Sequence, residues 1–93
     1  MEAGDQRMKP DRVVVWGAPG CDQCELAEMR LRLSGFLPEV KDLEKELECE
    51  PPVVRMEVMG AYQFQRAFPV LQVNDRGCTL SEGYEMLRVT ENG

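Results

Sequence analysis

The chain has 93 residues, 43% of them hydrophobic and 30% charged, and its formal net charge at pH 7 is −6. This length predicts one small domain over residues 12–93, behind a flexible tail at residues 1–11. The chain holds 11 Lys and Arg against 17 Asp and Glu, which argues against nucleic acid as a partner, because phosphates attract clustered cations. No apolar run approaches the ~20 residues that cross a bilayer, and residues 1–12 lack the apolar core of a secretory signal. We therefore expect a cytoplasmic protein that does not contact membranes.

The first predicted elements are a strand at residues 13–16 and a helix at residues 22–33. The strand is a short, continuous, β-branched run, which is typical of a buried strand in an α/β sheet. A Gly/Pro turn at residues 17–20 follows it, and then comes the motif Cys21-Asp22-Gln23-Cys24. The helix alternates apolar and charged residues, and Ser34-Gly35 is expected to end it, with Gly35 at the C′ position.

The middle of the chain is predicted as helix, strand and helix. Residues 39–48 are highly charged with a narrow apolar stripe, which indicates a surface helix whose glutamates, up to Glu50, face solvent. Pro51-Pro52 is expected to stop that helix. Residues 53–59 alternate well enough for a strand, which Gly60 would break, and residues 61–67 indicate a short helix.

The last predicted elements are a hairpin and a final helix. Residues 68–73 and 78–80 are expected to be strands joined by a turn at residues 74–77. Ser81-Glu82 is a suitable cap for a helix at residues 82–89. The chain is therefore predicted to be an α/β domain, with a four-stranded mixed sheet flanked by helices and an extra helix in the first crossover.

Four cysteines and no histidine narrow the chemistry. In a cytosolic chain, this many cysteines indicate redox or metal chemistry more often than structural disulfides. A four-sulfur zinc site would need Cys49 and Cys78 to join the CxxC pair, but their spacing does not repeat it. We therefore predict no metal site, and we interpret Cys49 and Cys78 as ordinary small residues.

The position of Cys21 suits a nucleophile. Only the thiolate attacks a disulfide, and the unpaired N–H groups at a helix start stabilise its negative charge. Cys24 lies about one turn further on, where it can resolve a mixed disulfide. Asp22 and Glu25 act in the opposite direction, because nearby negative charge disfavours the thiolate.

Pro69 is the second element of the candidate site, since it opens a predicted strand 45 residues after Cys24. With this proline, the chain resembles the glutaredoxin-like group of the thioredoxin superfamily over residues 12–89. The resemblance rests on residues 13–16, Pro19-Gly20-Cys21-Asp22-Gln23-Cys24, Phe68-Pro69-Val70, Asn74-Asp75 and Ser81-Glu82.

The resemblance implies a thioredoxin-like (glutaredoxin-like) fold with a cis Pro69 beside the dithiol. It also implies that the Phe68 backbone pairs with a bound peptide or glutathione, and that Ser81 and Glu82 hold the amino-acid end of glutathione. The chain departs from the family pattern at Ala18, where a basic residue is usual, and at Thr79-Leu80, where two glycines are usual. Arg66 and Arg76 are the candidate substitutes for the missing cationic anchor.

We therefore predict an enzyme that exchanges thiols and disulfides, with Cys21 as the nucleophile and Cys24 as the resolving cysteine. Phe68, Pro69, Ser81 and Glu82 are the predicted substrate-binding residues. The expected substrates are protein or small-molecule disulfides, with no tightly bound cofactor and with glutathione or a flavin reductase as electron donor. One alternative is a non-catalytic thioredoxin-fold adaptor that binds a protein through its acidic surface. Another is a carrier that holds an iron–sulfur cluster between two subunits.

Overall fold

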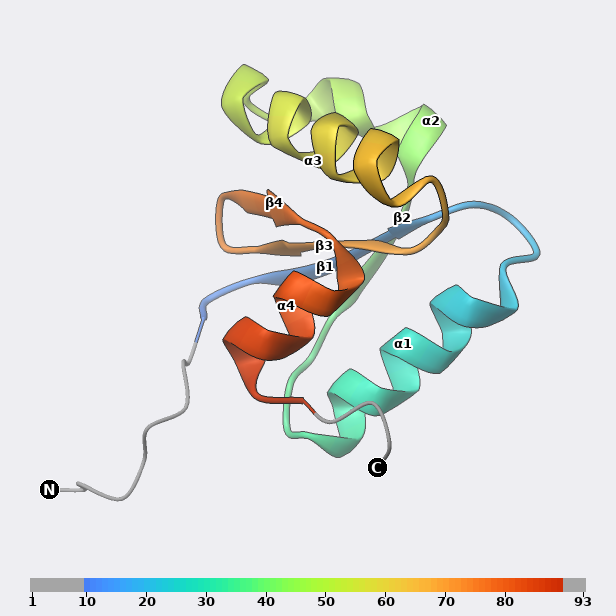
Figure 1. Ribbon diagram of the computed structural model, residues 1–93, viewed down its shortest axis with the longest axis vertical. Helices are drawn as coiled ribbons and strands as arrows, with labels where there is room; N and C mark the ends of the chain where they lie inside the picture. The colour runs from blue at the N-terminus through green and yellow to red at the C-terminus, as the bar shows by residue number, and fades with distance from the viewer. Residues whose placement is uncertain (1–9, 90–93) are drawn as a thin grey trace, which may run out of the picture.

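The computed structural model describes residues 10–89, so most of the tail predicted at 1–11 lies outside the described part. The elements follow in the order β1 (Val13–Gly17), α1 (Asp22–Leu33), β2 (Glu39–Asp42), α2 (Leu43–Glu46), the 3-10 helix η1 (Leu47–Cys49), α3 (Pro52–Gln65), β3 (Val70–Val73), β4 (Arg76–Cys78) and α4 (Leu80–Leu87). The strands form one mixed sheet in the order β2-β1-β3-β4. β1 pairs with β2 in parallel and with β3 in antiparallel orientation, and β4 is antiparallel to β3. Figure 1 shows α1 and α4 on one face of the sheet and α2 and α3 on the other.

Two hydrophobic layers pack against opposite faces of the sheet, because successive residues of a strand point to opposite sides. The layer toward α1 and α4 includes Val13, Val15, Ala27, Leu31, Leu71 and Leu87. The layer toward α2 and α3 includes Val14, Trp16, Leu43, Val54, Val58 and Val70. The run at residues 13–16 is therefore buried on both faces, which confirms the strand predicted there.

Helix α1 has the bounds that the sequence predicted, and it ends as expected. Gly35 adopts a φ of 97°, a conformation that is easy only for glycine. This turn lets the Gly35 N–H donate to the Arg32 carbonyl and the Phe36 N–H donate to the Leu31 carbonyl, both at 3.0 Å. The last turn of the helix is thereby closed, and the chain is directed into β2.

The helix predicted at residues 39–48 is wrong in its first half, and with it the extra helix in the first crossover. Residues Glu39–Asp42 form β2, in register with β1 so that Val15 faces Val40. Only Leu43–Glu46 is α-helical, and it begins after Asp42, whose side chain accepts the Glu44 N–H at 2.9 Å. Pairing with the edge of β1 outweighs the helical preference of a charged segment, because it satisfies a row of backbone groups at once.

Charges at this edge of the sheet are paired rather than solvated. Arg12 Nε lies 2.9 Å from Glu39 Oε2, and Arg12 Nη2 lies 3.1 Å from Glu50 Oε2. Lys41 Nζ lies 3.0 Å from the same Glu50 oxygen. Glu50 is only 5% exposed, so the solvent-facing position predicted for it is wrong. The hydrogen bond from Arg12 holds the pKa of the Glu50 carboxyl below its usual range.

The strand predicted at residues 53–59 is wrong, because this segment belongs to α3. Pro52 occupies the first turn, where a missing N–H has no consequence. The buried positions Val54, Val58 and Ala61 repeat at helical spacing, while Met56, which a strand would place on the same face as Val54 and Val58, is 73% exposed. Gly60 does not interrupt α3. The helix continues to Gln65 and so includes most of the residues predicted as a separate short helix at 61–67.

The final hairpin and helix are confirmed, with shifted bounds. Asn74 adopts a φ of 56° in the turn between β3 and β4. α4 starts earlier than predicted, and its cap is Thr79 rather than Ser81. The Thr79 side chain accepts the Glu82 N–H at 3.2 Å, and the Glu82 carboxylate accepts the Thr79 N–H at 3.1 Å. The result is a four-stranded mixed sheet with helices on both faces, an α/β arrangement compatible with the thioredoxin-like fold.

Candidate dithiol site

Cys21 and Cys24 lie together at the N-terminus of α1. Cys21 is the N-cap residue, in an extended conformation, and its Sγ accepts the Cys24 N–H at 3.1 Å. The two cysteines are joined by a disulfide, with their Cα atoms 5.3 Å apart. A sulfur at this position meets the N–H groups that the first turn of a helix leaves unpaired.

The two sulfurs differ in burial. Cys24 is 5% exposed and belongs to the layer under α1 and α4, whereas Cys21 is only half-buried at the rim of that layer. Gly17, the last residue of β1, makes room for the pair: a Cβ built there overlaps Cys24 Sγ. The end of β1 therefore positions the buried cysteine, and the N-cap leaves the other one accessible.

A shallow cavity of about 210 Å³ opens beside Cys24. Its lining comes from the end of β1 and the loop after it, from α1 and from β2: Gly17, Ala18, Pro19, Cys24, Val40, Lys41 and Asp42. The sequence did not predict the β2 side of this cavity, because its pattern at residues 39–48 indicates a surface helix. Among these residues Asp42 is the partner of Gly17 in the register of β1 and β2, which brings a carboxylate to the dithiol end of the sheet.

Pro69 is brought to the same end of the sheet. The Phe68–Pro69 peptide bond is cis, and Pro69 is fully buried. Trp16 faces Val70 in the register of β1 and β3, so Pro69 immediately precedes the pair that lies nearest the CxxC loop. Figure 1 shows the loop before β3 and the loop after β1 at one end of the sheet. Phe68 is half-buried and stacks on Tyr62 with ring centroids 4.7 Å apart.

Gln65 is a site-bordering residue that the sequence did not reveal. Its Nε2 donates to the carbonyl oxygens of Ala67 and Pro69, both at 2.6 Å. Its Oε1 accepts the Leu80 N–H at 2.7 Å. One amide side chain thus connects the end of α3, the loop around Pro69 and the start of α4. Only the folded chain brings these three segments together, and no sequence pattern marks the residue.

Ser81 and Glu82 lie in the first turn of α4, and both are exposed. The Glu82 carboxylate takes part in the capping of α4. Glu82 also lines a cavity of about 380 Å³ against α3 and β4, and neither Cys21 nor Cys24 lines that cavity. Contact of Ser81 and Glu82 with glutathione stays a prediction, as does contact of Phe68 and Pro69 with a substrate.

The two arginines suggested as cationic anchors differ in position. Arg76 is paired with Glu57, with Nε 3.2 Å from Oε1. It faces Val73 in the hairpin, at the end of β3 that is remote from Pro69. Arg66 ends α3 in a left-handed conformation with a φ of 59°. Arg76 is therefore remote from the cysteine pair, whereas Arg66 ends α3 just before the loop that carries Pro69.

The other two cysteines do not join the pair. Cys78 is buried, its thiol donates to the Leu71 carbonyl at 3.6 Å, and burial raises its pKa to about 12. Such a thiol is inert as a nucleophile near neutral pH. Cys49 is a free, exposed thiol at the end of η1. Within residues 10–89, no three Cys, Asp or Glu side chains come together as a set of metal ligands.

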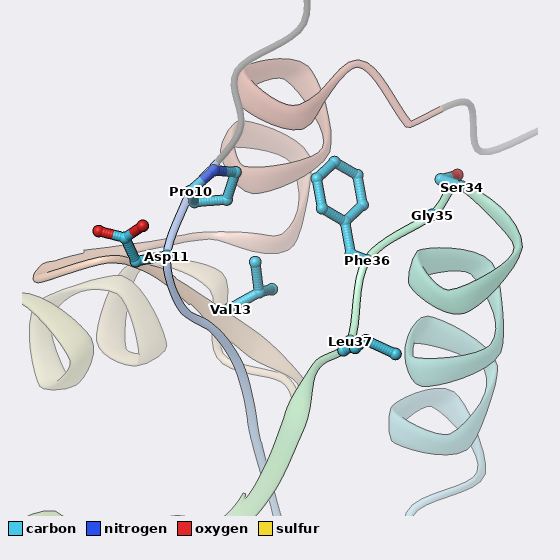
Figure 2. A pocket seen from close by; sticks show the side chains of 7 residues that line it. All are labelled: Pro10, Asp11, Val13, Ser34, Gly35, Phe36 and Leu37. Carbon is cyan, nitrogen blue, oxygen red and sulfur yellow. The ribbon is translucent and has the colours of Figure 1, made fainter.

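The largest of the described cavities lies away from the cysteines. It measures about 400 Å³ and is lined by Pro10, Asp11, Val13, Ser34, Gly35, Phe36 and Leu37. Figure 2 shows it between the start of β1 and the loop after α1, with the Phe36 ring on one side and Pro10 on the other. Asp11 and Ser34 are the polar residues of its lining, and no cysteine borders it.

Comparison of the chain with protein-family models, curated sequences and solved structures gives no match. In the part of the chain that the structure describes, no helix combines the length and apolar content needed to cross a membrane. The case for a function therefore rests on the cysteine pair and its surroundings.

Proposed function

We propose that this chain is a glutaredoxin-like thiol–disulfide oxidoreductase of the thioredoxin superfamily. One observation carries the proposal: a CxxC pair at disulfide distance in the first turn of α1, with an accessible first cysteine and a buried second one. This asymmetry suits a nucleophile that must reach a substrate and a second thiol that need only reach the first. The cis Pro69 at the same end of the sheet and the strand order β2-β1-β3-β4 give further support.

In this proposal Cys21 is the nucleophile of the reduced enzyme. The Cys24 N–H, already 3.1 Å from Cys21 Sγ, donates to the thiolate, and the positive end of the α1 dipole adds to its stability. The thiolate attacks one sulfur of a substrate disulfide, so that a Cys21–substrate disulfide forms and the other substrate sulfur leaves as a thiolate that takes up a proton.

Cys24 then completes the exchange. It loses its proton and attacks Cys21 Sγ, which forms the Cys21–Cys24 disulfide and releases the second substrate thiolate. The substrate gains two electrons and the enzyme loses two. A thiol donor, glutathione or the dithiol of a flavoprotein reductase, must then reduce the pair again. Phe68 and Pro69 would form one wall of the docking groove, and Ser81 and Glu82 would hold glutathione.

Alkylation and redox equilibration test this function. We expect iodoacetamide to modify Cys21 at pH 7 at least tenfold faster than Cys49, the exposed thiol that serves as an internal standard. We also expect the pair to equilibrate in glutathione buffers at roughly −200 to −270 mV. A Cys21 no more reactive than Cys49, together with a pair that stays oxidised throughout this range, would identify a structural disulfide and overturn the proposal.

A second candidate, a non-catalytic binding domain, is favoured by the outer face of α3. Val53, Met56 and Phe64 lie on it and are 60%, 73% and 85% exposed. Large apolar side chains this exposed are frequent in protein interfaces. Slow reduction of insulin despite a readily reduced Cys21–Cys24 pair would favour the binding domain over the enzyme.

A further inference from the structure

Three carboxylates lie on the segments next to the disulfide. Asp22 lies between the two cysteines and Glu25 directly follows Cys24, and both are exposed. Asp42 lines the cavity beside Cys24, although it is 21 residues away in the chain, because β2 pairs with the end of β1. Within residues 10–89 none of the three takes part in an ion pair, and Asp42 accepts only the N–H that caps α2.

Lys41 is the cation among the residues that line the cavity beside Cys24, and its ammonium is paired with a carboxylate. Lys41 pairs with Trp16 in the register of β1 and β2. The Trp16 side chain belongs to the layer toward α2 and α3, so Lys41 lies on that face of the sheet. Its ammonium lies 3.0 Å from Glu50 Oε2 and 5.5 Å from the centre of the Trp16 ring. Further along α1, Arg30 borders a separate groove of about 110 Å³ between α1 and α4. Because Lys41 is paired with Glu50, it does not neutralise Asp22, Glu25 or Asp42, and an incoming disulfide meets these three carboxylates on the segments next to the cysteine pair.

We propose, on the basis of the oxidoreductase function above, that the substrate is a disulfide carried on a positively charged polypeptide. Opposite charges accelerate encounter and like charges slow it, and a low-dielectric concave site strengthens both effects. Glutathione disulfide is anionic at neutral pH, so Asp22, Glu25 and Asp42 would repel it. Position 18, where the family usually has a basic residue that could anchor it, is occupied by Ala18. Lysine or arginine residues flanking a substrate cysteine would instead pair with these carboxylates. Pro19 and Val40, both exposed, add an apolar rim for a peptide chain.

The test compares two synthetic peptides in single-turnover reduction. Each carries one cysteine in a mixed disulfide with 2-mercaptoethanol, flanked by lysines in one peptide and by glutamates in the other. The reduced protein is mixed with each peptide at pH 7, and the released peptide thiol is quantified. Each rate is divided by the rate with dithiothreitol, an uncharged thiol, because flanking charge also changes the intrinsic reactivity of the disulfide.

We expect the normalised rate to be about tenfold higher for the lysine peptide at low ionic strength, and the preference to vanish near about 0.5 M salt. The double variant Asp22→Asn, Asp42→Asn should lose most of the preference, since Asn still caps α2. Asp75→Asn, in the turn at the far end of β3, is the matched control and should keep it. Asp22→Asn alone, at an exposed position, provides the same test independently of any effect on α2.

The outcomes separate the two proposals. Equal normalised rates, or a faster reaction with the glutamate peptide, overturn the charge preference and leave the oxidoreductase intact. Reduction of both peptides no faster than by the Cys21→Ser variant overturns the oxidoreductase, and the substrate class with it.

Discussion

Carboxylates are held in ion pairs at one end of the paired strands β1 and β2, and at the other end they have no ion-pair partner in the described residues. At the start of β1, Glu39 and Glu50 are bound by Arg12, and Glu50 also by Lys41, so that a nearly buried charge is fully partnered. At the other end, Asp42 and Asp22 lie beside the disulfide without an ion pair in the described residues. Removing one partner at the paired end would leave the nearly buried Glu50 carboxylate without its full set of partners, which destabilises the folded state. The unpaired carboxylates are available to a substrate.

The largest effect should come from breaking the chemistry at the dithiol end. Cys24→Ser leaves Cys21 able to attack but removes the resolving thiol, so steady-state disulfide reduction should fall by about 100-fold or more. Mass spectrometry should then detect the trapped Cys21–substrate disulfide. The matched control is Cys49→Ser, which should retain the wild-type rate. Full activity of Cys24→Ser would contradict the role of Cys24 and leave a one-cysteine mechanism.

The next largest effect should come from the paired end. Arg12→Ala leaves Glu50 with Lys41 as its remaining partner, and we expect it to lower the free energy of unfolding by about 2 kcal/mol. Arg32→Ala is the control, because it removes an exposed pair with Glu28 on α1 and should cost only about 0.4 kcal/mol. Urea denaturation of the wild type, Arg12→Ala and Arg32→Ala measures the loss of unfolding free energy in each variant. Equal losses for the two variants would show that the network at Glu50 adds no more than a surface pair.

The paired end should also give stability a dependence on pH. The pKa of Glu50 is lowered in the folded state, so its carboxylate contributes stability above the unfolded value of about 4.5. This contribution is lost as the pH falls through the lowered folded-state pKa. The difference in unfolding free energy between wild type and Glu50→Gln should therefore be constant from pH 7 to 5 and shrink below about 4.5. A difference that stays constant down to pH 3 would rule out the carboxylate as its source.

The smallest effect should come from the unpaired end. Asp22→Asn removes a negative charge next to Cys21, so alkylation of Cys21 at pH 7 should become about two- to threefold faster. The effect should diminish with added salt, because Asp22 is exposed. Asp75→Asn again serves as control, and it should leave the alkylation rate unchanged. No acceleration in Asp22→Asn would mean that the neighbouring carboxylate does not affect the thiolate.

The segments that were predicted correctly carry their signals locally. Strand β1 is a run of apolar residues, and α1 is bounded by Cys21 and by Gly35, whose conformations do not depend on distant partners. Residues 39–42 and 53–59 were predicted wrongly because their signals are ambiguous. Glu39–Asp42 is charged like a helix surface, and its strand exists through pairing with β1. Residues 53–59 fit both a strand alternation and a helix, and burial of Val54 and Val58 against the sheet selects the helix.

The sequence by itself determined the CxxC pair, its place between a buried strand and a helix, and the α/β class. These features follow from residue spacing within about a dozen positions, over which periodicity and turn chemistry act. Only the tertiary structure placed Asp42 beside Cys24, turned Lys41 toward Glu50, and joined α3, Pro69 and α4 through Gln65. Each of these depends on strand register or on the packing of elements distant in the chain, because a carboxylate or an amide finds such a partner only when the strands and helices are brought together.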